Sequence, residues 1–132
     1  MELYREKEYV SQFHYDARNF QWEEVNGAPT TKVVGKTDIV DRRPEDQRTI
    51  VSVTLDFMVV MATNVVSGRI MQVSHILNRV LGENETLTEA EMMELQEPCM
   101  DMLRRLTYEV TEIALDEPGI ALEEYAENVE RP

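Results

Sequence analysis

The chain has 132 residues, of which 42% are hydrophobic, and its formal net charge is −13 at pH 7. This length and composition fit one globular domain over residues 1–132, and the negative charge argues against DNA or RNA as the main ligand. No segment is apolar and long enough to span a bilayer, so we expect no membrane insertion. The charged N-terminus lacks the apolar stretch of a signal peptide, and the single cysteine, Cys99, suits a reducing compartment. We therefore expect a cytoplasmic protein.

Residues 8–23 suggest a first strand that changes phase. Four apolar residues share one parity, and two aromatic residues share the other. The two sets are Tyr9, Phe13, Tyr15 and Ala17, then Phe20 and Trp22. A β-bulge or bend near residues 17–19 would reconcile the two phases. Asn26 and Gly27 then form a turn signal.

The strongest strand signal lies in residues 49–77. A weaker strand over residues 32–41 and a turn over 42–46 precede it, and two long strands follow at about 48–62 and 65–77. Apolar residues alternate along the first of these long strands, which is typical of a sheet with one buried face. Its other face is partly apolar as well, so we expect something to cover it. Gly68 suggests a bulge or a close approach of two backbones.

Helices follow the strands. Thr88 and Glu91 have the spacing of a capping box after a polar loop at residues 82–86, which predicts a short helix over about 88–96. Pro98 is suited to the first turn of a second helix. An amphipathic stripe in that helix comprises Cys99, Met102, Leu103, Leu106, Val110 and Ile113. The helix should stop at residues 116–119, and the acidic tail from about residue 123 should fray.

This order of elements predicts an α+β fold. Four strands joined by short connections favour an antiparallel β-meander, and two C-terminal helices would follow it, one of them packed on a sheet face.

Residues with catalytic or metal-binding chemistry do not form a recognisable set. His14, His75 and Cys99 could meet at a zinc site, but paired ligands such as C-x-x-C are absent and structural roles are the default. Ser74 and His75 are sequence neighbours and would point to opposite sheet faces. There is no G-x-S-x-G elbow and no glycine-rich phosphate loop. We therefore expect no enzyme, cofactor or metal site.

The methionines are the more informative group. Most lie between residues 58 and 102, and methionine is common on surfaces that accept varied apolar partners. Ordinary core and subunit contacts would explain them too. The candidates for a subunit contact or a client-binding surface are Met58, Val60, Met93 and Met100, because these are hard to bury within one subunit.

Two runs of sequence carry a resemblance to a known family. Residues 8–19 (EYVSQFHYDARN) and 104–116 (RRLTYEVTEIALD) resemble an uncharacterised family of small proteins of Gram-positive bacteria, a domain of unknown function. The resemblance extends over about residues 5–122. That family is similar in fold to the export chaperone SecB. In this chain the likeness to SecB rests on the order of the strands, a glycine in the fourth strand and a helix after Pro98.

The resemblance implies a four-stranded antiparallel sheet with two helices. It also implies dimers joined edge to edge, tetramers joined through helices, and apolar grooves that hold unfolded polypeptides. No local motif for the contact of SecB with its motor partner is present, so the fold can carry over without the activity. Two functions stay open: a SecB-like binder of unfolded or apolar polypeptide segments, or an oligomeric adaptor whose apolar surface is used in self-assembly.

Overall fold

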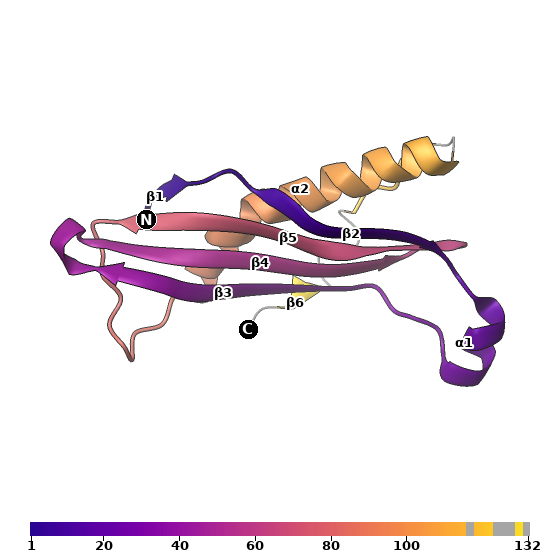
Figure 1. Cartoon of the computed structure of the whole chain (residues 1–132), viewed down its shortest axis with the longest axis horizontal. Helices are drawn as coiled ribbons and strands as arrows, with labels where there is room; N and C mark the ends of the chain where they lie inside the picture. The colour runs from indigo at the N-terminus through magenta and orange to yellow at the C-terminus, as the bar shows by residue number, and fades with distance from the viewer. Residues whose placement is uncertain (116–117, 123–128, 131–132) are drawn as a thin grey trace.

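The centre of the computed structural model is a long β-hairpin made of β4 (Arg48–Val60) and β5 (Asn64–Leu77). The structure describes residues 1–115, 118–122 and 129–130. In this part of the chain one six-stranded sheet has the order β1–β5–β4–β3–β6, and β2 also pairs with β5 (Figure 1). The other strands are β1 (Glu2–Arg5), β2 (Tyr9–Ala17), β3 (Lys32–Arg43) and β6 (Val129–Glu130), and the helices are α1 (Phe20–Asn26) and α2 (Glu89–Leu115).

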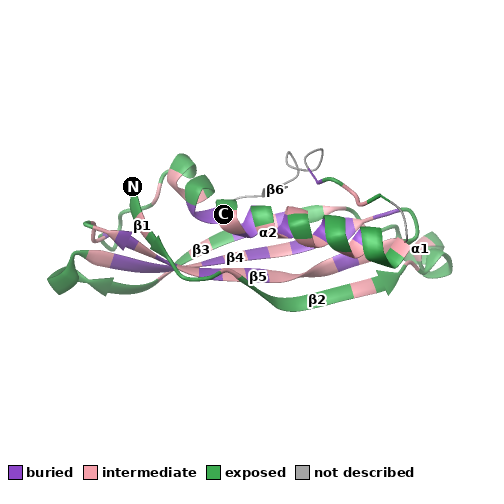
Figure 2. Ribbon diagram, turned by 90° about the horizontal axis from the view of Figure 1, so that it is seen from above, coloured by how far each residue is buried: buried purple, intermediate pink, exposed green. Residues whose placement is uncertain are grey.

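One face of the central hairpin is buried beneath α2 (Figure 2). Alternate residues of β4 point into this core, and they are Val51, Val53, Leu55, Phe57 and Val59. The register places Leu55 opposite Ile70 of β5, so the buried positions of both strands share one face. Each such side chain contributes roughly 1.5–3 kcal/mol when it is fully buried. The α+β fold and the two strong strands predicted from the sequence are confirmed.

The N-terminal strand is shorter than predicted. β2 ends at Ala17, and the aromatic residues that follow belong to the helix α1. The Asn19 side chain caps this helix by accepting from the Trp22 amide at 3.1 Å. Gly27 ends it with a φ of 94°. The predicted bulge at residues 17–19 is therefore wrong, because the change of phase is the start of a helix. The bulge of β2 lies between Val10 and Gln12.

Gly68 marks a close approach of two backbones, as its sequence context suggested. A Cβ at this position would lie 2.1 Å from the carbonyl oxygen of Gln12 on β2. Only glycine lets the two strands come this near. β1 and β2 both pair with β5, at Ser74–Leu77 and at Asn64–Met71 respectively.

Other boundaries differ from the predicted ones. β3 extends to Arg43 and is followed by a 3-10 turn, η1 (Pro44–Asp46). β1 was not predicted. The tail expected to fray lies mostly outside the described residues. Its described part, β6, pairs in parallel with β3 at Val33 and Val34, whereas the other strand pairs in the described residues are antiparallel.

The two predicted C-terminal helices are one continuous helix, α2, with Pro98 inside it. Proline has no backbone N–H, so the carbonyl of Glu94 loses its helical donor. The structure replaces that donor with the Arg5 side chain of β1, whose Nη2 donates to Glu94 O at 2.7 Å. The sequence-based break at Pro98 is wrong because the compensating group lies 89 positions away in the chain.

The start of α2 follows the prediction. The Thr88 amide donates to Glu91 Oε1 at 2.9 Å, and the Glu91 amide donates to Thr88 Oγ1 at 3.2 Å. These reciprocal hydrogen bonds form a capping box. The bond that the Thr88 amide donates to the carboxylate favours its ionised form and lowers the pKa of Glu91, and the hydrogen bond from Arg79 adds to this effect.

The apolar stripe of α2 faces the sheet only in its first half. Cys99 and Leu103 are buried, but further along the buried positions are Thr107 and Thr111, while Ile113 is 81% exposed. Thr111 Oγ1 donates to the Thr107 carbonyl at 2.7 Å and accepts from the Ile120 amide at 2.9 Å. Thr111 therefore occupies the buried face because its hydroxyl fastens the segment of residues 118–122 to the helix.

The bond between Arg5 and Glu94 predicts a coupling between β1 and α2. Arg5→Ala should lower the free energy of unfolding by about 0.5–1.5 kcal/mol. This loss is smaller than that expected for a buried charged hydrogen bond, because the site is exposed. In a Pro98→Ala background the restored amide can satisfy Glu94, so the same substitution should cost less. Urea unfolding of the four proteins measures this coupling. Lys7→Ala is the matched control for loss of charge, and equal costs in both backgrounds would contradict the coupling.

Candidate apolar binding site

The four residues predicted for a contact surface do not lie together. Met58 and Val60 are on the face of β4 that points away from α2, and Met58 is 38% exposed. Met93 is 49% exposed, but it lies on α2, on the other side of the sheet. Met100 is only 7% exposed and packs in the core. Its predicted place on an outer surface is wrong, because α2 turns this side chain towards the sheet.

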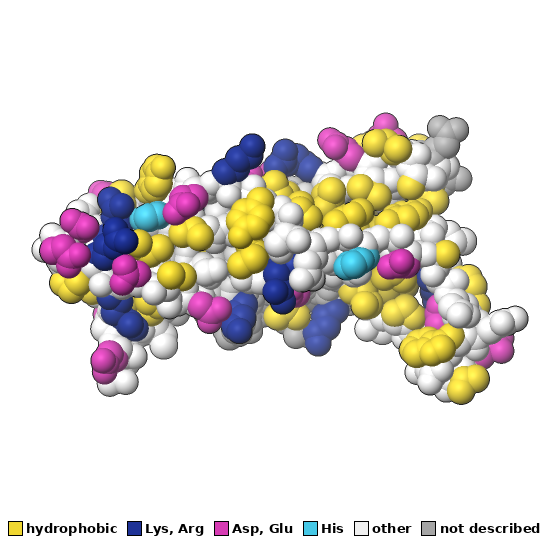
Figure 3. Space-filling view, in the orientation of Figure 1, with side chains coloured by type: hydrophobic (Ala, Val, Ile, Leu, Met, Phe, Trp, Pro, Cys, Tyr) yellow, Lys and Arg dark blue, Asp and Glu magenta, His cyan; other side chains and the backbone are white. Residues whose placement is uncertain are grey.

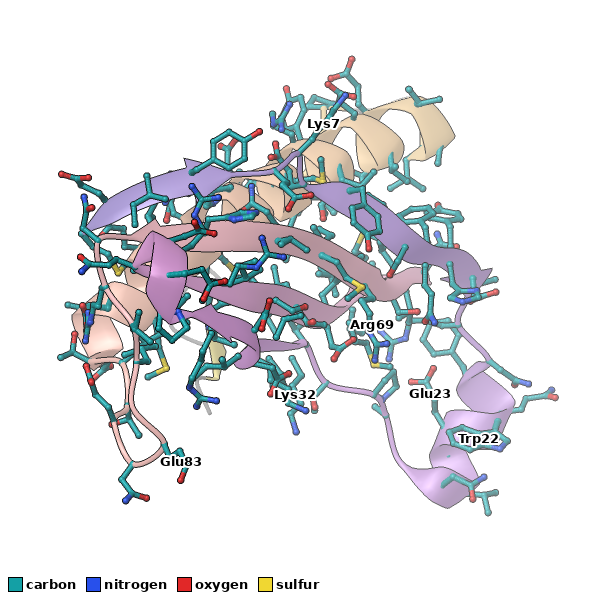
Figure 4. All side chains as sticks on the ribbon, turned by 60° about the vertical axis from the view of Figure 1, so that its left-hand side comes forward. Lys7, Trp22, Glu23, Lys32, Arg69 and Glu83 are labelled. Atoms are coloured by element: carbon teal, nitrogen blue, oxygen red, sulfur yellow. The ribbon has the colours of Figure 1, made fainter. Side chains whose placement is uncertain are left out.

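The outer face of the sheet is mixed, not uniformly apolar. Arg69 of β5 and Asp56 of β4 form an ion pair on it, with Nε to Oδ1 at 2.7 Å. The hydrogen bond to Asp56 raises the pKa of the Arg69 guanidinium. Figure 4 shows Arg69 and Lys32 over this face. Towards its α1 end the same face carries Met58, Val60 and Val65.

A hollow of about 470 Å³ lies at that end, between α1 and the outer face of the sheet. Trp22 and Pro29 form one side of it, and Met58 and Val65 form the floor. A second hollow of about 320 Å³ adjoins it along β3 and β4 and is lined in part by Val34 and Met58. Because both hollows share Met58, they form one depression. We call this depression the Met58 trough.

Arg18 fixes α1 beside the trough. Its guanidinium donates twice to Glu23, at 3.2 Å to Oε2 and 2.5 Å to Oε1, and once to the Met61 carbonyl at 3.0 Å. The same group lies 4.7 Å from the centre of the Phe20 ring. The hydrogen bond from Arg18 lowers the pKa of Glu23. In Figure 4, Glu23 points from α1 back towards the sheet. The pair therefore joins α1 to the end of β4.

Large apolar side chains are exposed around this end of the molecule. Trp22 is 58% exposed on α1. Figure 3 shows hydrophobic side chains gathered over β2 and α1. The exposed members on these two elements are Tyr9, Val10, Phe13, Phe20, Trp22 and Val25. A group of this kind next to a hollow marks an interaction surface.

Sequence reasoning missed the α1 side of the trough. Trp22 and Glu23 were absent from the predicted set because residues 8–23 were interpreted as a strand. A signal was present: Asn19 is a favoured N-cap, and Gly27 follows at the position where helices end. Seven residues are too few for helical periodicity to be visible, so only these two end signals could have revealed the helix.

Two of the groups considered for zinc or catalysis, His75 and Cys99, have structural partners or are buried. His75 Nε2 lies 2.9 Å from Glu6 Oε2, and its Nδ1 lies 3.3 Å from Arg48 Nη1. Cys99 is fully buried, and burial raises the pKa of its thiol to about 11, with a smaller effect of Glu8. No group of three or more potential metal ligands occurs in the described residues. Among the same residues, no helix is long and apolar enough to cross a membrane.

The solved structures similar to this chain include the following two. A crystal structure of a protein of unknown function from Streptococcus agalactiae is 43% identical, with a TM-score of 0.88, over 93% of this chain and 98% of that one. The SecB-like chaperone Rv1957 of Mycobacterium tuberculosis, in complex with a ChAD peptide from the Rv1956 HigA1 antitoxin, is 13% identical. Its TM-score is 0.50, over 92% of this chain and 89% of the chaperone.

The comparison with protein families gives the more specific result. No curated protein matches the chain. The family described as "Protein of unknown function (DUF1149)" matches residues 1–124. The family resemblance seen in residues 8–19 and 104–116 is thereby confirmed, and the similarity to the SecB-like chaperone confirms the fold expected with it. The chain belongs to the DUF1149 family and has a SecB-like fold.

Proposed function

We propose that this protein binds unfolded or extended apolar segments of other polypeptides in the Met58 trough. The observation that carries the proposal is the exposure of Trp22 beside a hollow of about 470 Å³ floored by Met58 and Val65. Leaving an indole in water beside an open apolar surface is unfavourable unless a partner covers both. The proposed role is binding, not catalysis, and its proposed place is the cytoplasm.

The chemistry of the trough suits an adaptable binding site. Trp22 offers a large, rigid contact, and Met58 offers a flexible one that can adjust to different side chains. Glycine and proline at positions 27 and 29 shape one wall. The peptide bound by the SecB-like chaperone of Mycobacterium tuberculosis supports the idea that this fold can hold a polypeptide.

Trp22→Ser tests the role of the trough directly. Loss of a large apolar contact should weaken the binding of an unfolded client about tenfold or more. The measurement is light scattering of chemically denatured citrate synthase diluted into buffer, at several ratios of the protein to the client. Met58→Glu should have a similar effect because it places a charge where the two hollows meet.

Val25→Ser is the matched control for this experiment. Val25 is exposed on the same helix but does not line the trough. The Val25→Ser variant should therefore suppress aggregation as well as the wild-type protein does. The proposal fails if the wild-type protein does not suppress aggregation at several-fold excess, or if the control variant loses as much activity as Trp22→Ser.

The ion pair of Arg18 and Glu23 makes the position of α1 depend on acid pH. The pKa of Glu23 is lowered from 4.5, so its stabilising effect is present above about pH 4.5 and is lost as the pH falls through the folded-state pKa. Trp22 is the single tryptophan of the chain, so its fluorescence reports on α1. Between pH 7 and pH 3 the wild-type emission should change in a step below pH 4.5.

Glu23→Gln removes the charge at every pH, so its emission at pH 7 should already resemble that of the acid form, and the acid step should shrink. Glu24→Gln, at the exposed neighbouring position, should keep the step. An unaltered acid step in Glu23→Gln would show that another group controls the helix.

The alternative function, an oligomeric adaptor, is favoured by one feature of α2. The second half of this helix exposes Tyr108 and Ile113, because Thr107 and Thr111 take the buried positions. A partner copy that covers this side would use up apolar surface in self-assembly. Both proposed functions are compatible with a homodimer or a homotetramer.

Sedimentation velocity tests self-assembly through α2. We expect the wild-type chain to sediment as a dimer or tetramer, and Ile113→Glu to sediment as a smaller species because a charge enters the apolar contact. Glu112→Ala, a change at the neighbouring exposed position, should have no effect. A monomeric wild-type protein would eliminate the adaptor alternative.

A further inference from the structure

The methionines of this chain differ widely in their access to solvent and in their place on the fold. Of the eight methionines, all of which the structure describes, Met58 is the one that lines both hollows of the Met58 trough. Met58 is 38% exposed, whereas Met61 and Met100 are buried in the core. Met93 is also exposed, but it lies on α2, away from the trough. Exposure and a place in the trough therefore coincide at Met58.

The other sulfur atoms near the sheet are better protected from a soluble oxidant. Met71 lies on the same outer face but is half-buried, and its sulfur accepts a hydrogen bond from the Tyr9 hydroxyl at 3.7 Å. That hydrogen bond engages a lone pair of the thioether, which is the electron pair that an oxidant attacks. Cys99 is fully buried, and burial raises the pKa of its thiol to about 11, so little reactive thiolate is present.

Oxidation by a peroxide changes a methionine side chain from apolar to polar. The thioether sulfur gives an electron pair to one oxygen of hydrogen peroxide. An S–O bond forms as the O–O bond breaks, and the second oxygen leaves as water. The sulfur is oxidised by two electrons and the peroxide is reduced by two. Methionine sulfoxide reductases reverse the step with a dithiol, which becomes a disulfide while the oxygen leaves as water.

At Met58 the sulfoxide oxygen would enter the floor that the two hollows share. Covering this oxygen with an apolar segment is unfavourable unless it receives a hydrogen bond. Arg18 and Asn26, two donors that line the larger hollow, already donate to Glu23 and to the Trp22 carbonyl. A bound apolar segment brings no side-chain donor of its own. Oxidation at this position therefore acts directly against binding.

We propose that Met58 is a reversible oxidation site whose sulfoxide closes the Met58 trough to apolar segments. This inference rests on the binding function proposed for the trough and adds its regulation. The oxidant is a small peroxide, which reaches the exposed side chain from solvent. The reduced thioether admits a client segment, and the sulfoxide excludes it until a reductase removes the oxygen.

The test uses the full chain treated with hydrogen peroxide, which is removed by desalting before the client is added. Peptide mass mapping should show the gain of one oxygen at Met58 and Met93 before the buried Met61 and Met100 react. Suppression of citrate synthase aggregation should then need about tenfold more protein. Methionine sulfoxide reductases with dithiothreitol should remove the oxygen and restore the suppression.

Met93→Leu is the matched control, because Met93 is exposed but does not line the trough. Before treatment this variant should suppress aggregation as the wild-type protein does. After treatment it should lose suppression in proportion to the fraction of Met58 sulfoxide. Met58→Leu has nearly the same volume and no oxidisable sulfur at this position. Whatever suppression Met58→Leu shows before treatment should survive the peroxide.

Three results would overturn the proposal. They are a Met58 that stays unoxidised while Met93 is fully converted, full suppression by the oxidised wild-type protein, and a loss of suppression in treated Met58→Leu equal to that of the wild type. The wild-type and Met93→Leu measurements decide the question even where Met58→Leu binds weakly. If the untreated wild-type protein does not suppress aggregation, the proposed function fails and the switch fails with it. Suppression that survives oxidation overturns the switch alone.

Discussion

The alternation of buried and exposed residues along β4 and β5 is the constraint on which the rest of the fold depends. It directs one set of side chains, such as Leu55 and Ile70, under α2 and leaves the opposite set, including Met58, in contact with solvent. A shift of one residue in the register would exchange the two faces. The close approach at Gly68 constrains the neighbouring pair of β2 and β5, because a Cβ at this position would lie 2.1 Å from the carbonyl oxygen of Gln12.

Two arginines connect the N-terminal segment to elements far away in the sequence. Arg5 satisfies the carbonyl that Pro98 leaves without a donor, so β1 supports the middle of α2. Arg18 joins Glu23 to the Met61 carbonyl, so α1 is supported by the end of β4. The Arg5 contact replaces a missing hydrogen bond of α2, and the Arg18 contact positions α1. Local sequence alone would supply neither of them. The first 26 residues therefore complete the site and do not merely extend the sheet.

The sequence predicted those features that depend on neighbouring residues. The strands at the centre, the capping box of Thr88 and Glu91, and the close approach at Gly68 all follow from local spacing. The continuity of α2 depends on Arg5 and could not be read at Pro98. The trough was only half predicted: the alternation along β4 identified Met58, but α1 was hidden because its seven residues resemble strand periodicity. Met100 was misplaced because the buried face of α2 includes Gln96, Met100, Thr107 and Thr111, which do not all belong to the apolar stripe of the sequence.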